Sequence, residues 1–137
     1  MDETKQPGIS FDSIALVKEE FWRDYDVPVN SKVNFKVGIS TSQDGDKYFA
    51  QLTFNVALTA EEKEVCKINT VWVGFFSVVD GHENMDINYY IKENSAALMF
   101  PFIREHIAVI TQKAGIKPIY LPPINIRALL KKNEKQG

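Results

Sequence analysis

The stretch from about residue 64 to residue 79 restricts the possible folds most, because its later half is apolar on both faces of a strand. Its early half alternates between polar and apolar side chains, whereas Val71-Trp72-Val73 and Phe75-Phe76 place apolar groups on both sides. A strand with two apolar faces needs cover on both. A helix of the same chain can supply one cover. In a chain of 137 residues we expect a second subunit or a bound partner to supply the other.

Three further strands precede this one. Residues 9–22 carry apolar side chains on both faces, interrupted by charges toward the end. Residues 33–39 and 48–58 alternate strictly between apolar and polar side chains, which is typical of half-buried strands. Between them, Asp44-Gly45 supplies the positive φ that a hairpin turn needs. Short turns between four strands predict an antiparallel meander over residues 9–79.

A long helix is expected after the sheet. Residues 84–93 fit either a short helix or an irregular crossing. Asn94-Ser95 is good N-cap chemistry, and the apolar side chains that follow recur at i, i+3, i+4 and i+7. These signals predict a helix over 94–115 lying on the sheet, with Gly115 at its C-terminal end. Pro101 indicates either a kink or a later start of this helix.

The ends of the chain complete the expected domain. Residues 1–8 are polar and predict a flexible arm, and the prolines in 116–125 predict an extended loop. A short helix over 126–132 and a polar tail over 133–137 follow. The sequence therefore predicts one α+β domain over residues 1–137, with a four-stranded antiparallel β-meander followed by a long helix and a short C-terminal helix.

Charge and hydropathy argue against several classes of protein. Sixteen Lys and Arg residues against eighteen Asp and Glu give a net charge of −2, too balanced for a general nucleic-acid binder. No run of about 18 apolar residues is present, so we expect no membrane insertion. The polar N-terminus lacks a basic start leading into an apolar run, which argues against a secretory signal and for the cytoplasm.

We find no residues arranged for catalysis or metal binding. His82 and His106 are far apart, and neither stands in a ligand spacing. We expect His106 to be a satisfied or partly exposed histidine of the long helix. Cys66, the single cysteine, excludes an internal disulfide and is expected to fill apolar space on a strand. No glycine-rich phosphate loop or calcium loop is present. We therefore predict a protein that is not an enzyme and needs no cofactor or metal.

Apolar surface is in surplus. Both faces of two strands and the segment 119–124, Ile-Tyr-Leu-Pro-Pro-Ile, carry more of it than one helix can cover. Burial in an oligomer can explain the whole surplus. Alternatively, part of it lines a groove for an extended apolar peptide. A third possibility is a small α+β domain that binds an apolar small molecule between helix and sheet.

The C-terminal third resembles the SecB family of protein-export chaperones. The run 94–105, NSAALMFPFIRE, is similar to the Leu-Phe-Pro-aromatic-x-Arg-Glu run in the long helix of that family. Gly115 and the run 119–126, IYLPPINI, resemble its extended loop, which ends in Pro-(Val/Ile)-Asn-aromatic. Residues 74–78, GFFSV, resemble the end of its sheet. The similarity covers about residues 9–132.

The resemblance implies a homotetramer built as a dimer of dimers. It implies an ATP-independent chaperone that holds unfolded precursor proteins by apolar and backbone contacts and passes them to the export motor SecA. A member dedicated to one client, such as the antitoxin of a toxin–antitoxin pair, stays open as a variant.

The resemblance also implies which residues face the client. Carried over by position, they are Val33, Phe35 and Val37 of the second expected strand, Ile119, Leu121 and Ile124 of the extended loop, Leu129 and Leu130 of the last helix, and Trp22 and Phe76. For each of them, ordinary packing in the core is the competing interpretation.

Overall fold

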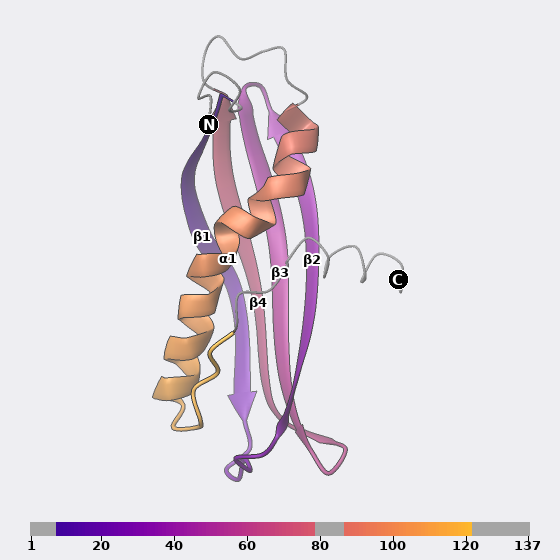
Figure 1. Ribbon diagram of the computed structural model, residues 1–137, viewed down its shortest axis with the longest axis vertical. Helices are drawn as coiled ribbons and strands as arrows, with labels where there is room; N and C mark the ends of the chain where they lie inside the picture. The colour runs from indigo at the N-terminus through magenta and orange to yellow at the C-terminus, as the bar shows by residue number, and fades with distance from the viewer. Residues whose placement is uncertain (1–7, 79–86, 122–137) are drawn as a thin grey trace, which may run out of the picture.

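The computed structural model describes residues 8–78 and 87–121 and contains one antiparallel sheet covered on one face by one helix. The elements are β1 (Ile9–Arg23), β2 (Lys32–Asp44), β3 (Lys47–Ala60), β4 (Lys63–Val78) and α1 (Ile87–Lys113). The helix crosses the long sheet diagonally (Figure 1). The predicted α+β architecture is confirmed. The expected short helix over 126–132, the tail and most of the arm lie outside the described residues.

The strands lie in the order β1-β4-β3-β2. β2, β3 and β4 form the expected meander through tight turns in which Gly45, Glu61 and Glu62 have positive φ. β1 pairs with β4 at the other edge, from Ile9 beside Val78 to Arg23 beside Cys66. The prediction of a meander through all four strands was therefore wrong for β1.

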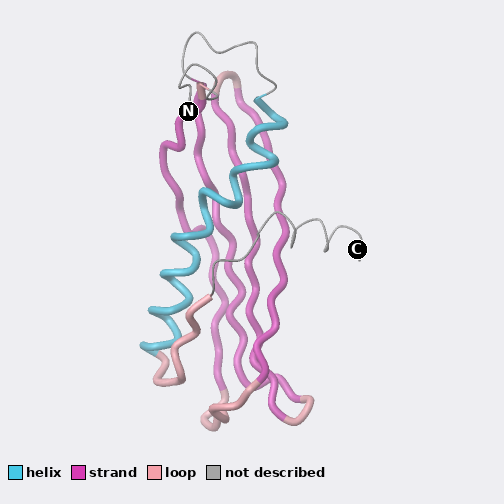
Figure 2. Tube along the Cα trace, viewed as in Figure 1, coloured by secondary structure: helices cyan, strands magenta, loops and turns pink. Residues whose placement is uncertain are grey.

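The connection between β1 and β2 explains this difference. Residues 24–31 form no hairpin but pass the ends of β4 and β3, a distance of about 14 Å at the usual strand spacing. The order is that of a Greek key. It places β4, with its two apolar faces, inside the sheet (Figure 2).

The core lies between the sheet and α1. Alternate residues of β3 and β4 point toward the helix, and Phe54 is fully buried among them. Its ring centroid lies 6.0 Å from that of Phe100 on α1 and 6.1 Å from that of Phe35 on β2. The helix contributes Met99, Ile103 and Ile107, all fully buried. Apolar burial of this kind stabilises a fold by about 25 cal/mol per Å².

The other face of the sheet has no cover among the described residues, and it is divided. Toward the β2–β3 hairpin it carries an apolar patch, where Phe49 and Phe75 pack edge to face at 5.6 Å. Toward the β3–β4 turn it is polar, where Lys36, Asn55 and Asn69 lie in one row across three strands. The expected second apolar face of the sheet is thus confined to one half.

The helix begins earlier than the sequence suggested. It starts at Ile87, so Asn94-Ser95 lies inside it and caps nothing. The Asn94 side chain donates to the carbonyl of Tyr90, one turn back, and Ser95 is fully buried. The predicted start at residue 94 was wrong, because residues with N-cap chemistry also occur within helices when tertiary packing outweighs their preference. Pro101 lies inside the helix, so the kink is the alternative that fits.

We expect Gly74→Ala to destabilise the protein by about 1–3 kcal/mol, the usual cost of overpacking a core. A Cβ at Gly74 would lie 2.9 Å from Sδ of Met99, which is fully buried and has little room to move. Urea unfolding measures the loss. Gly38→Ala is the matched control, since its Cβ would meet only the Thr53 hydroxyl, at 3.1 Å. Equal losses for both variants would contradict a tight contact between α1 and β4.

Candidate binding groove

An apolar groove of about 380 Å³ lies where the segment after α1 comes close to β2 and to the β1–β2 connection. Its lining is mostly aliphatic and aromatic. The lining residues are Arg23 of β1, Val27, Pro28, Val29 and Ser31 of the connection, Val33 and Phe35 of β2, Leu58 of β3, and residues 115–121. The groove therefore joins parts of the chain that are far apart in the sequence.

The end of α1 directs the chain into the groove. Gly115 has a φ of 74°, its N–H donates to the carbonyl of Gln112, and the N–H of Ile116 donates to the carbonyl of Thr111. These bonds form a Schellman motif, which needs a glycine at the left-handed position. The prediction that Gly115 follows the last turn of the helix is confirmed.

Thr111 fixes the segment 115–121 to the helix. Its hydroxyl is buried, donates to the carbonyl of Ile107 at 2.8 Å and accepts the N–H of Ile119 at 3.0 Å. The segment has no strand partner, so this hydroxyl satisfies a backbone donor that would otherwise face apolar surroundings. Thr111 thus holds one wall of the groove in place.

Arg23 connects β1 to the end of the helix. Its guanidinium donates to the carbonyls of Ala114 at 2.6 Å, Tyr25 at 2.8 Å and Asp24 at 2.8 Å. A cation at the C-terminus of a helix also interacts favourably with the helix dipole. Opposite, the Ser31 hydroxyl donates to the carbonyl of Pro28 at 2.6 Å and shapes the connection that forms the other wall. Both walls are therefore held by hydrogen bonds.

The structure brings four of the predicted client-facing residues together. Val33, Phe35, Ile119 and Leu121 line the groove. Val33 is 38% exposed at the rim, whereas Leu121 is 3% exposed and lies deep. Val37 is 4% exposed and belongs to the core next to the groove.

The remaining predicted residues lie elsewhere. Phe76 is 2% exposed under the helix and stacks on Phe11 at 5.1 Å. This position agrees with ordinary packing in the core, the competing interpretation of this residue. Trp22 pairs with Lys67 on the uncovered face of the sheet and does not line the groove. Ile124, Leu129 and Leu130 lie outside the described residues.

Sequence reasoning missed the β1–β2 connection and Arg23 as parts of this groove. Val27 and Val29 are apolar residues in a segment that reads as a turn, and Val29 is largely exposed. Two valines in an otherwise polar connection were the available signal. Nothing in the sequence connects Arg23 with residues 115–121, because their contact depends on how α1 crosses the sheet.

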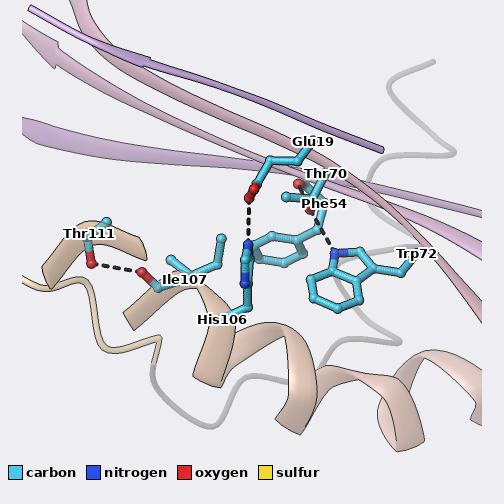
Figure 3. Close-up of polar contacts among 7 residues, drawn as sticks. All are labelled: Glu19, Phe54, Thr70, Trp72, His106, Ile107 and Thr111. Carbon is cyan, nitrogen blue, oxygen red and sulfur yellow. Dashed lines mark hydrogen bonds and ion pairs between the residues drawn. The ribbon is translucent and has the colours of Figure 1, made fainter. Parts of the chain in front are cut away.

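A polar cluster between α1 and the sheet is structural (Figure 3). His106 of α1 pairs with the carboxylate of Glu19 on β1, and its ring packs edge to face on Trp72 at 5.4 Å. The indole N–H of Trp72 donates to the Thr70 hydroxyl at 2.8 Å, which donates to the carbonyl of Phe54 at 2.6 Å. His106 is thus half-buried and satisfied, as predicted.

Cys66 also has a structural environment. It is 1% exposed, and burial raises the pKa of its thiol above the usual value. A thiol held in its neutral form is a poor nucleophile. This agrees with the prediction that Cys66 fills apolar space.

Within residues 8–78 and 87–121, no three His, Cys, Asp or Glu side chains are grouped closely enough to hold a metal ion. None of the helices in this part of the chain is sufficiently long and apolar to cross a membrane. His82 lies outside these residues.

Known proteins resemble this chain in sequence and in fold. The protein-export protein SecB of Orientia tsutsugamushi is 26% identical over 140 residues, which cover 95% of this chain and 86% of that protein. An uncharacterized protein of Methanocaldococcus jannaschii is 35% identical over 81 residues, 55% of this chain and 51% of that protein, so the chain spans about half the length of this relative.

The fold has a solved counterpart. The SecB-like chaperone Rv1957 of Mycobacterium tuberculosis, solved in complex with a ChAD peptide from the antitoxin HigA1, aligns with a TM-score of 0.74 at 11% identity, covering 85% of this chain and 91% of that one. The family model described as preprotein translocase subunit SecB matches residues 8–137. Because this match spans nearly the whole chain, the protein belongs to the SecB family.

Proposed function

We propose that this protein is an ATP-independent chaperone that holds unfolded precursor proteins for export, with the groove between β2 and residues 115–121 as a client site. The observation that carries this proposal is an open groove whose lining residues are mostly apolar, although the chain as a whole is 25% charged. Membership of the SecB family supports the proposal.

The groove suits an extended chain without demanding one sequence. An unfolded client exposes apolar runs, and their burial recovers about 25 cal/mol per Å² whatever their order. Among the described residues, β2 lies at an edge of the sheet, and extended peptides bind to other proteins along such edges. Several weak contacts along one client raise the effective concentration of each further contact, which slows release.

Aggregation of a denatured precursor tests the proposal. The purified protein, without nucleotide, is mixed with the precursor as denaturant is diluted, and light scattering follows aggregation. We expect suppression at a substoichiometric ratio of assembled chaperone to precursor. Unchanged scattering at a tenfold excess of chaperone would reject the chaperone function.

The same proposal includes a dimer of dimers. α1 exposes Leu98, Phe102 and Val109 to solvent, and Phe102 is 48% exposed although its ring contacts that of Phe11 on β1 edge to face at 6.0 Å. Leu16 of β1 is exposed as well. Apolar side chains gathered on one element are typical of subunit interfaces.

We expect Phe102→Glu to lower the mass of the assembly, because a carboxylate buried at such an interface costs several kcal/mol. Light scattering coupled to gel filtration measures the mass of the wild type and of the variant. Glu64→Gln, an exposed change on β4 away from this helix, is the control. A wild-type monomer at micromolar concentration, or a variant with unchanged mass, would reject this interface.

Transfer of clients to SecA and a cytoplasmic location stay part of the proposal. A chaperone dedicated to a single client, such as an antitoxin, would differ only in the range of clients that it binds. A chaperone that protects several unrelated precursors equally well is general, whereas one that protects a single client is dedicated.

Binding of an apolar small molecule is the second candidate. The groove volume of about 380 Å³ lies at the lower end of the range for small-ligand sites, roughly 300–1,000 Å³. Thermal unfolding with a panel of fatty acids and aromatic compounds tests this alternative. A raised melting temperature together with no suppression of aggregation would favour it.

A further inference from the structure

One arginine side chain holds the beginnings of two groove walls, the segment 115–121 and the β1–β2 connection. Nη1 of Arg23 donates to the carbonyl of Ala114, directly after α1, at 2.6 Å. Its Nε and Nη2 donate to the carbonyls of Asp24 and Tyr25, each at 2.8 Å, where the connection starts. We propose that Arg23 is a positioning residue, which sets the separation of these two walls and thereby the rate at which a client leaves the groove. This inference rests on the proposed function, because it concerns the same groove.

The three hydrogen bonds join distant parts of the chain. Ala114 lies 91 residues after Arg23, and the chain continues from it into the segment 115–121. On the other side, the connection continues from Tyr25 to Val27 and Val29, which line the groove. A displaced guanidinium would therefore shift the two walls relative to each other.

Both walls consist of irregular backbone. Residues 24–31 and 115–121 form neither strand nor helix. Ordering such backbone when a client binds costs conformational entropy, and a groove that is ordered beforehand avoids this cost. The Thr111 hydroxyl holds the later part of one wall through the N–H of Ile119 at 3.0 Å. Arg23 holds the beginning of the same wall and ties it to the other, so it prepares the groove for the client.

The shape of the guanidinium suits this role. The group is planar, and each of its three nitrogens donates one of the three bonds. Arg23 is half-buried, and hydrogen bonds shielded from water are electrostatically stronger than those in water. The carbonyl of Ala114 lies at the negative end of the helix dipole, where a cation is favourable. A lysine has the same charge on a single nitrogen, so it cannot reproduce this arrangement.

Spin labels on the two walls test the positioning. Val29 is 77% exposed and Tyr120 is 75% exposed, and they line the groove from different walls. Val29→Cys and Tyr120→Cys accept the labels after Cys66→Ala has removed the single native cysteine. Electron paramagnetic resonance without client measures the distances, and each variant with one label identifies distances between subunits. We expect a narrow distribution in this parent protein and a broader one after Arg23→Gln or Arg23→Lys.

Release of a labelled apolar peptide tests the consequence for the client. Stopped-flow dilution measures the release rate in chains without spin labels, and thermal unfolding shows whether each variant is folded. We expect Arg23→Gln to speed release about tenfold and Arg23→Lys to speed it about fivefold. Lys47→Gln removes an exposed cation at the other end of β3 and should leave release unchanged.

The outcomes separate this inference from the proposed function. If Arg23→Lys matches the wild type in both measurements, or release speeds up while the distances stay the same, the positioning role is wrong and the chaperone function stands. A broad distribution of distances in the parent protein would reject the role even if neither Arg23 variant folds. If the wild type binds no peptide and does not suppress aggregation, the proposed function itself is wrong.

Discussion

Phe35→Asp combined with Leu121→Asp is expected to abolish suppression of precursor aggregation and to weaken peptide binding by at least about 30-fold, or 2 kcal/mol. The two residues come from β2 and from the segment 115–121, so the pair places carboxylates on both walls of the groove. Binding of an apolar client would then remove water from two carboxylates, and the client offers these charges no partner. Anisotropy of a labelled apolar peptide and light scattering measure the two effects.

The interpretation of this result depends on the fold of the variant. Leu121 is buried, so Leu121→Asp can also loosen the segment that carries it. Val33→Ser with Tyr120→Ser changes two exposed lining residues and should weaken binding by about tenfold with little effect on stability. Trp22→Ser, on the uncovered face of the sheet, is the matched control. If Trp22→Ser weakens binding as much as the groove variants do, the client site lies elsewhere.

Phe54→Ala is expected to destabilise the protein by about 3–5 kcal/mol, the usual cost of removing a buried aromatic ring. Phe54 is fully buried at the centre of β3, and its ring packs between Phe35 of β2 and Phe100 of α1. Removing the ring therefore leaves a cavity between the sheet and the helix. Urea unfolding, monitored by the fluorescence of Trp72 and Trp22, measures the loss.

Phe49→Ala is the control for this experiment. Phe49 lies on the same strand but on the uncovered face, where it is half-buried against Phe75. We expect it to lose about 1–2 kcal/mol, in proportion to the smaller apolar area that it buries within one chain. A loss as large as that of Phe54→Ala would mean that this face of the sheet is as deeply covered in the assembly as the helix side is.

Local patterns predicted the elements well but not how they are placed. The alternation in residues 48–58 marks β3 because side chains of a strand point to opposite faces. The position of β1 could not be read in this way, since pairing with β4 depends on contacts far apart in the sequence. For α1, the spacing of Ile87, Ile91 and Ser95 continues the buried stripe, and this signal was outweighed by the apparent cap at Asn94-Ser95.

The same distinction applies to the groove, where some lining residues could be predicted from the sequence and others could not. Val33, Phe35, Ile119 and Leu121 were predictable because they lie in segments with a clear pattern and a clear family resemblance. Arg23 was not, because its contact with Ala114 is made only once α1 has crossed the sheet. Sequence patterns find residues that bury their own side chains, and they do not show which distant backbone a side chain will reach.

The strand order has a consequence for the sequence of folding events. β2, β3 and β4 follow one another through tight turns, so they can zip together with little loss of loop-closure entropy. β1 must wait for a partner that lies beyond them in the chain. As the polypeptide leaves the ribosome, its earliest strand is therefore the one left longest without a neighbour, and it stays exposed until β4 has been made.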